Sequence, residues 1–256
     1  MNRLGWITER AEGLGRLSFL VKDIAVSLCT RAPSGRHLLY QTYFIGVKSQ
    51  SVVLITGAFT GMVLAAQTYF QFHKVRMDTA TMAVVSVSMC SELGPVLTGL
   101  MVAGRVGAAL AAELGTMRVT EQIDALRTLA THPVDYLVVP RFLATLIAMP
   151  VLAAESISLG IASGYLIGTS YLVIEPAYLW HNMVKYTLQE HVLTGLIKAF
   201  IYGAIIALIS CYKGMTCGEG AEGVGRATTE AVVYSAITIL ISNFFLTLIL
   251  NRLLGT

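Results

Sequence analysis

Five long apolar segments constrain this chain more than any other feature of its sequence. They cover residues 52–72, 79–112, 140–171, 192–212 and 231–250. Each reaches the roughly 20 residues that a helix needs to cross the hydrocarbon core of a bilayer. Because they are continuously apolar and far longer than a barrel strand, they predict transmembrane helices rather than strands. We therefore expect an all-α integral membrane protein with about five transmembrane helices.

The composition supports this fold class and excludes several functions. Only 13% of the 256 residues are charged and 55% are hydrophobic, whereas soluble domains average about 25% charged residues. The net charge of +3 is too small for a nucleic-acid-binding module, so no nucleic-acid partner is expected. The four cysteines form no C-x-x-C pair and the five histidines are isolated, so no metal or other cofactor is expected on this chain.

The first fifty residues differ from the rest of the chain in carrying many charges. Their apolar residues recur at helical spacing, at Leu14, Leu17, Val21, Ile24 and Leu28. This pattern predicts a helix lying in the membrane interface. A soluble helix packed on its own protein is the alternative. We accordingly treat residues 1–256 as a single domain, with an interfacial segment at 1–50 and a transmembrane bundle at 51–256.

The distribution of lysine and arginine predicts the orientation of the chain. If the N-terminus is cytoplasmic, twelve of these residues lie in cytoplasmic segments, and only Lys74, Arg76, Lys185 and Arg252 lie on the far side. Short cytoplasmic loops carry an excess of positive charge. We therefore expect a cytoplasmic N-terminus and a C-terminus on the opposite side.

Four charged residues fall inside the apolar segments, where facing lipid would be costly. They are Glu92, Arg105, Glu155 and Lys198. An ion pair between Glu92 and Lys198 would remove most of the cost, either beside a transport cavity or merely to fix the register of two helices. Arg105 can extend its guanidinium toward the inner surface. No partner for Glu155 is evident from the sequence.

Catalytic and nucleotide-binding motifs are missing from the sequence. Residues 218–223 match the G-x-G-x-x-G pattern, but they lie in a short loop between two spans, without the strand that a dinucleotide site requires. We interpret them as a turn. The chain is therefore not expected to be an enzyme, and any ATP hydrolysis would belong to a separate subunit.

The loop between the second and third spans has the pattern of a short amphipathic helix. Val119, Ile123, Leu126 and Ala130 fall on one helical face, and Pro133 ends the element. Held between two spans on the cytoplasmic side, such a helix suits docking to a motor subunit; a helix lying on the membrane surface is the alternative. The glycine spacings at Gly57/Gly61 and at Gly160/Gly164/Gly168 predict close helix packing, within one chain or between two copies.

Several segments resemble the MlaE (YrbE) permease family, in order and over nearly the whole chain. They are residues 61–67 (GMVLAAQ), 92–95 (ELGP), 103–109 (AGRVGAA), 112–126 (AELGTMRVTEQIDAL) and 223–233 (GVGRATTEAVV). The resemblance implies the permease subunit of an ABC-type transporter that moves phospholipids between the inner and outer membranes and maintains outer-membrane lipid asymmetry. A non-transporting membrane scaffold or a channel subunit is the alternative.

The resemblance also implies partners and a location. The chain would form a homodimer in the bacterial inner membrane, with its C-terminus in the periplasm. Its partners would be a cytoplasmic ABC ATPase that uses ATP, a possible STAS-domain protein and a periplasmic MCE-domain hexamer. The family's coupling helix corresponds to residues 113–129, with Glu113, Gly115, Val119, Glu121, Ile123 and Leu126. Its lipid cavity corresponds to Leu64, Gln67, Phe70 and Phe72, with Glu92 and Lys198 as a charged pair nearby. Ser91 and Asn243 depart from residues found in some relatives.

Overall fold

The computed structural model describes residues 3–30 and 35–254. Within these ranges the chain is helical and contains no strand. Five helices are long and apolar enough to cross a membrane, at Gly35–His73, Asp78–Val119, Val134–Ser170, Gln189–Met215 and Gly220–Leu253. The predicted all-α membrane architecture is confirmed.

Several of the long helices are built from consecutive pieces, because short π-helical turns interrupt the α-helical hydrogen bonding. The first comprises α2 (Gly35–Thr42), the π-helical η1 (Tyr43–Val47) and α3 (Lys48–His73). The second comprises η2 (Asp78–Ala80), α4 (Thr81–Ser88), η3 (Met89–Leu93), α5 (Gly94–Val102), η4 (Ala103–Gly107) and α6 (Ala108–Val119). After the short α7 (Gln122–Thr128) come η5 (Val134–Val138) with α8 (Val139–Ser170), then α9 (Pro176–Tyr186), α10 (Gln189–Met215) and α11 (Gly220–Leu254).

The first long helix begins earlier than the sequence predicts. It is continuous from Gly35, so the boundary drawn at residue 50 cuts through a single helix. Ile45 is fully buried in the main core together with Val53 and Met149, which shows that this region packs along α8. Polar residues such as Gln41 and Lys48 interrupt the apolar run here, which is why the sequence pattern predicts an interfacial segment.

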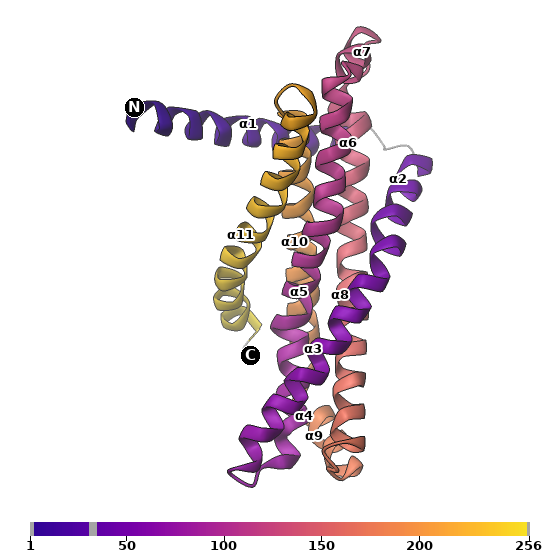
Figure 1. Ribbon diagram of the computed structural model, residues 1–256, viewed down its shortest axis with the longest axis vertical. Helices are drawn as coiled ribbons and strands as arrows, with labels where there is room; N and C mark the ends of the chain where they lie inside the picture. The colour runs from indigo at the N-terminus through magenta and orange to yellow at the C-terminus, as the bar shows by residue number, and fades with distance from the viewer. Residues whose placement is uncertain (1–2, 31–34, 255–256) are drawn as a thin grey trace.

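The N-terminal helix α1 (Arg3–Thr30) lies across one end of the bundle and does not run along the long helices (Figure 1). Leu20 and Ile24 are buried against Leu114 and other residues of that end. Val21 and Leu28, which the sequence places on the same apolar stripe as Ile24, are instead 43% and 38% exposed. One face of α1 therefore packs on its own protein, while its place in the membrane interface stays a prediction; the side chain of Leu14 lies outside the described residues.

Glycines bring α3 and α8 into close contact within one chain. A Cβ atom on Gly61 would overlap the backbone carbonyl of Gly160, and one on Gly57 would come within 2.7 Å of the carbonyl oxygen of Ser156. Small residues let helix backbones approach in this way in membranes. Of the two contacts that the glycine spacing allows, the structure forms the intramolecular one.

The two ends of the bundle carry different elements. The corner between α6 and α7, the connection between α10 and α11, and α1 lie together at one end, and the turn between α3 and α4 lies with α9 at the other (Figure 1). Arg118 of the first end donates a hydrogen bond to the carbonyl of Met215, which ties α6 to the end of α10. We refer to the end of the bundle that carries the corner between α6 and α7 as the α6–α7 end.

Candidate functional site

A buried charged pair lies inside the bundle. Lys198 of α10 and Glu92 of η3 are joined by a 2.6 Å contact between Nζ and Oε1. The Lys198 side chain is fully buried, and the Glu92 side chain is 36% exposed. Because an ion pair removes much of the cost of placing either charge in an apolar interior, the contact explains why these helices tolerate both residues. A role for the pair beside a lipid cavity stays a prediction.

Further hydrogen bonds complete the environment of this pair. Lys198 Nζ also donates to the Ser91 carbonyl at 3.0 Å and to Thr247 Oγ1 at 2.8 Å, which accounts for all three ammonium protons. Asn243 Nδ2 donates to Glu92 Oε2 at 3.1 Å. The Tyr202 hydroxyl donates to Asn243 Oδ1 at 2.7 Å. The network therefore ties the second long helix to α10 and α11.

Two members of this network, Tyr202 and Thr247, were not singled out from the sequence. Asn243 and Thr247 lie four residues apart in a span without charges, and this spacing is the sequence signal for a polar contact on one face of that helix. The position of Glu92 depends on the wide turn η3, which directly precedes Gly94 and Pro95. Proline lacks a backbone N–H and clashes with the preceding turn, so a local departure from α-helix is expected at this point.

The predicted lipid-cavity residues do not share one face of α3. Gln67 is exposed, and Phe70 is 57% exposed on a surface that continues along the helix through Val63 and Phe59. Leu64 and Phe72 are partly buried, and Leu64 packs against a core cluster within the chain. In the isolated chain, Gln67 and Phe70 are therefore the members most accessible to a second copy or a lipid.

The predicted coupling helix at 113–129 is not one helix. α6 ends at Val119, Glu121 has a left-handed backbone with φ of 58°, and α7 follows at Gln122. The turn folds α7 back so that Ile123, 5% exposed, joins a core cluster with Leu20 and Leu114. The expectation of an unbroken helix is wrong because burial of Ile123 outweighs the continuation of the helical pattern.

The six predicted coupling residues occupy different environments at this end. Ile123 is buried, Leu126 is partly buried beside it, and Gly115 lies beneath Val224 and Cys217. Glu113 forms an ion pair with Arg141, at 3.1 Å between Oε2 and Nη2. Val119 and Glu121 are exposed, as is Glu113, but Glu113 is engaged by Arg141, so Val119 and Glu121 are the exposed predicted residues without an ion pair among the described residues.

A cleft of about 720 Å³ separates the α6–α7 corner from the α10–α11 connection. Glu121 and Asp124 lie on one wall, and Gly218 and Gly220 on the other. The glycine-rich segment is a turn only at Gly218 and Glu219, because α11 already begins at Gly220, which has φ of 72°. A Cβ on Gly223 would overlap the backbone of Gly218, so the turn packs closely on the start of this helix. Cys217 also lines the cleft, and burial raises the pKa of its thiol above the ordinary value. Among the described residues, no group of histidine, cysteine and acidic side chains could hold a metal ion.

Comparison with known proteins gives these features a family. Residues 38–249 match the family described as permease MlaE. The chain is 48% identical over 238 residues to a probable ABC transporter permease protein of Rickettsia conorii, covering 93% of this chain and 92% of that one. It is 36% identical over 240 residues to the intermembrane phospholipid transport system permease protein MlaE of Haemophilus influenzae, covering 93% and 91%.

A plant relative extends this similarity. The protein trigalactosyldiacylglycerol 1, chloroplastic, of Arabidopsis thaliana is 38% identical over 211 residues, which cover 82% of this chain and 60% of that protein.

The region 38–249 that matches the family includes most of all five long helices and the Glu92–Lys198 network. With five apolar spans, a polar network inside them and relatives matched over most of their length, the chain belongs to the MlaE permease family.

Proposed function

We propose that this protein is the permease subunit of an ABC-type transporter that moves phospholipids between the inner and outer membranes. The observation that carries the proposal is the 36% identity, over 93% of the chain, with a Haemophilus influenzae protein named as an intermembrane phospholipid transport permease. Maintenance of outer-membrane lipid asymmetry is the cellular role that this activity would serve.

The α6–α7 end is the proposed docking site for a separate ABC ATPase, which would bind and hydrolyse ATP. Val119 and Glu121 are exposed there, beside the cleft that Gly218 also lines. α6 is the last part of the continuous helix Asp78–Val119, which also carries Glu92. A displacement at this corner would therefore pass directly to the charged network, with the π-helical turns η3 and η4 as the places where the helix can bend.

Exposed apolar faces support assembly around a lipid cavity. Phe59, Val63 and Phe70 of α3 are each more than half exposed, as are Phe244 and Leu248 of α11. In the proposed homodimer such faces would contact the second copy or the acyl chains, and burial of each CH₂ contributes about 0.8 kcal/mol. Gln67 would lie near the polar part of the lipid. A STAS-domain protein at the ATPase and an MCE-domain hexamer on the periplasmic side are further proposed partners.

The proposed location is the bacterial inner membrane, with the α6–α7 end in the cytoplasm. The structure gathers α1 and the loops rich in lysine and arginine at this end (Figure 1). An excess of positive charge in short loops favours the cytoplasmic side. This orientation would place the N-terminus in the cytoplasm and the C-terminus toward the periplasm.

Reconstitution tests the proposal. The complex that co-purifies with the tagged chain would be placed in vesicles, and transfer of a labelled phospholipid to acceptor vesicles would be measured with and without ATP. We expect transfer that requires ATP and that Val119→Asp reduces strongly, while an exchange at Lys22, an exposed residue of α1, serves as the control. ATP-independent ion flux without lipid transfer would instead support the channel alternative.

A further inference from the structure

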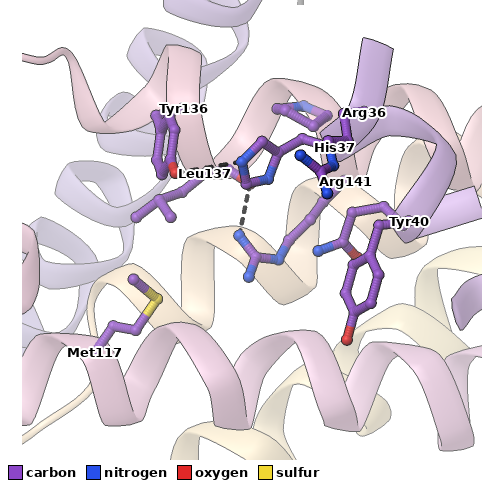
Figure 2. Close-up of a pocket in the computed structure, with 9 residues that line it drawn as sticks. Arg36, His37, Tyr40, Met117, Tyr136, Leu137 and Arg141 are labelled. Atoms are coloured by element: carbon purple, nitrogen blue, oxygen red, sulfur yellow. Dashed lines mark hydrogen bonds between the residues drawn. The ribbon is translucent and has the colours of Figure 1, made fainter. Parts of the chain in front are cut away.

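A pocket of about 400 Å³ lies where α2 meets the start of α8 (Figure 2). Arg36, His37, Tyr40 and Gln41 come from α2, Met117 from α6, and Tyr136, Leu137, Pro140 and Arg141 from η5 and α8. The rings of His37 and Tyr136 lie next to each other, and the Tyr136 hydroxyl is 3.3 Å from His37 Nε2. The pocket is therefore basic and aromatic, and it lies outside the network and the cleft described above.

Two buried polar atoms of this pocket have no hydrogen-bond partner among the residues that the structure describes. They are Arg141 Nε, a donor, and Gln41 Oε1, an acceptor, and each residue is only 8% exposed. The other guanidinium nitrogens of Arg141 are occupied, Nη1 by the Leu137 carbonyl and Nη2 by Glu113. Buried polar atoms without partners are rare in folded proteins and each calls for a ligand or a water. A group with both an acceptor and a donor would satisfy both atoms.

The charge of the pocket favours an anion. Arg36 is exposed at its rim and has no ion-pair partner within the described ranges. Arg141 is already paired with Glu113, so Arg36 supplies the uncompensated positive charge. Arginine recognises phosphate oxygens through several N–H groups at once. Tyr40 and Tyr136, 65% and 44% exposed, are of the residue type that is enriched at the membrane–water boundary.

Exposed apolar residues and a second, smaller pocket, whose lining also includes Gln50 and Glu155, lie farther along the same pair of helices. Arg36, Tyr40, Tyr43 and Val47 recur along one face of the first helix, and the last three are more than half exposed. Ile147 and Val151, also more than half exposed, provide the opposite wall from α8. Together with Val47 they line a second pocket of about 180 Å³. The distance from Arg36 to Val47 along the helix is about 16 Å, which is comparable to an acyl chain.

We infer that this seam between α2–η1 and α8 binds one anionic phospholipid from the leaflet at the α6–α7 end. Its phosphate would contact Arg36 and accept from Arg141 Nε, and a hydroxyl or amine of the headgroup would donate to Gln41 Oε1. One acyl chain would lie along Tyr43 and in the second pocket, beside Val47 and Val151. The inference concerns lipid binding alone and does not depend on ATP-driven transport.

Photo-crosslinking in nanodiscs tests the site with a defined probe. Phosphatidylglycerol with a diazirine in one acyl chain would be irradiated with the full-length protein, and labelled peptides would be identified by mass spectrometry. We expect enriched labelling of residues 43–47 and 147–151. Arg36→Gln should lower it about tenfold, the effect of one lost charge-assisted hydrogen bond. Lys22→Gln, which removes an exposed cation from α1 at the same end, should leave it unchanged.

Competition distinguishes the possible sources of the phosphate. Unlabelled phosphatidylglycerol should displace the probe, whereas diacylglycerol with the same chains and inorganic phosphate should not. Gln41→Leu, which removes the orphan acceptor while keeping Arg36, should reduce labelling without loss of the folded protein. Labelling of these peptides no stronger than that of the exposed face of α11, or labelling unchanged in both Arg36→Gln and Gln41→Leu, would overturn the inference. Displacement by inorganic phosphate alone would also overturn it, because it would show a phosphate site that does not hold a lipid.

Discussion

The Lys198 ammonium group bridges a side chain and the backbone of the same wide turn, at 2.6 Å from Glu92 Oε1 and 3.0 Å from the Ser91 carbonyl. It therefore fixes both the charge and the chain path of η3 against α10. A transporter that moves its helices relative to one another would have to carry or break this contact. The pair is thus a structural constraint whose removal has measurable consequences.

Replacement of Lys198 by methionine should destabilise the fold by about 3 kcal/mol, since it leaves the Glu92 carboxylate without its cation in an apolar bundle. Glu92 is one-third exposed, which limits the penalty. The double variant Glu92→Gln/Lys198→Met should recover part of the loss, because no charge is then left unpaired. Thermal unfolding in detergent would measure both effects.

Exchange of the two charges is a poor test of the same pair. A carboxylate at position 198 would face the Ser91 carbonyl, which now accepts a hydrogen bond from Lys198. Failure of Glu92→Lys/Lys198→Glu to recover stability is therefore expected even though the pair exists. Lys198→Met as stable as the unchanged protein would contradict the assigned role of the contact.

Gly61→Ala should destabilise the contact between α3 and α8. The added methyl group would overlap the carbonyl of Gly160, and two rigid backbones leave it no room. Overpacking of this kind costs about 3 kcal/mol. Gly104→Ala is the matched control, because no atom outside its own stretch of helix lies within 4 Å of the place that its methyl group would take. Equal melting temperatures for the two variants would show that the helices separate easily.

The transmembrane helices could be predicted because long apolar runs leave a chain few other ways to satisfy its backbone. The start of the first helix could not, since the burial of Ile45 depends on α8, about a hundred residues later in the chain. Periodicity placed Val119 and Ile123 on one face but did not say what that face contacts. Tyr202 and Thr247 are unexceptional in apolar spans, and only the tertiary packing brings them to Glu92 and Lys198.

The coupling end offers a pair of substitutions that separate folding from docking. Ile123→Asp should destabilise the fold by about 4 kcal/mol, because it places a carboxylate in a packed apolar cluster. Val119→Asp, at a position 38% exposed, should leave the melting temperature close to that of the unchanged protein. If the ATPase docks at this corner, Val119→Asp should nevertheless lower lipid-stimulated ATPase activity.

Comparison of melting temperature and ATPase activity in the same preparations would measure both effects. Full activity in Val119→Asp would move the proposed docking surface away from this corner. A stable Ile123→Asp variant would show that α7 detaches from the bundle without cost.

Cys217 provides a chemical probe of the cleft at the α6–α7 end. Its side chain lies in the connection between α10 and α11, and burial raises the pKa of its thiol, an effect that the nearby Arg118 guanidinium partly offsets. Only the thiolate reacts with maleimides, so a raised pKa shifts the reaction to higher pH. In a variant that retains Cys217 alone, the alkylation rate should level off at a higher pH than in the same chain unfolded in detergent. Restricted access of the reagent would slow the reaction at every pH without moving the pH at which the rate levels off. The pH profile therefore separates restricted access from a raised pKa. A profile identical to that of the unfolded chain would show that the thiol is hydrated, and slower labelling with the ATPase bound would place that subunit over the cleft.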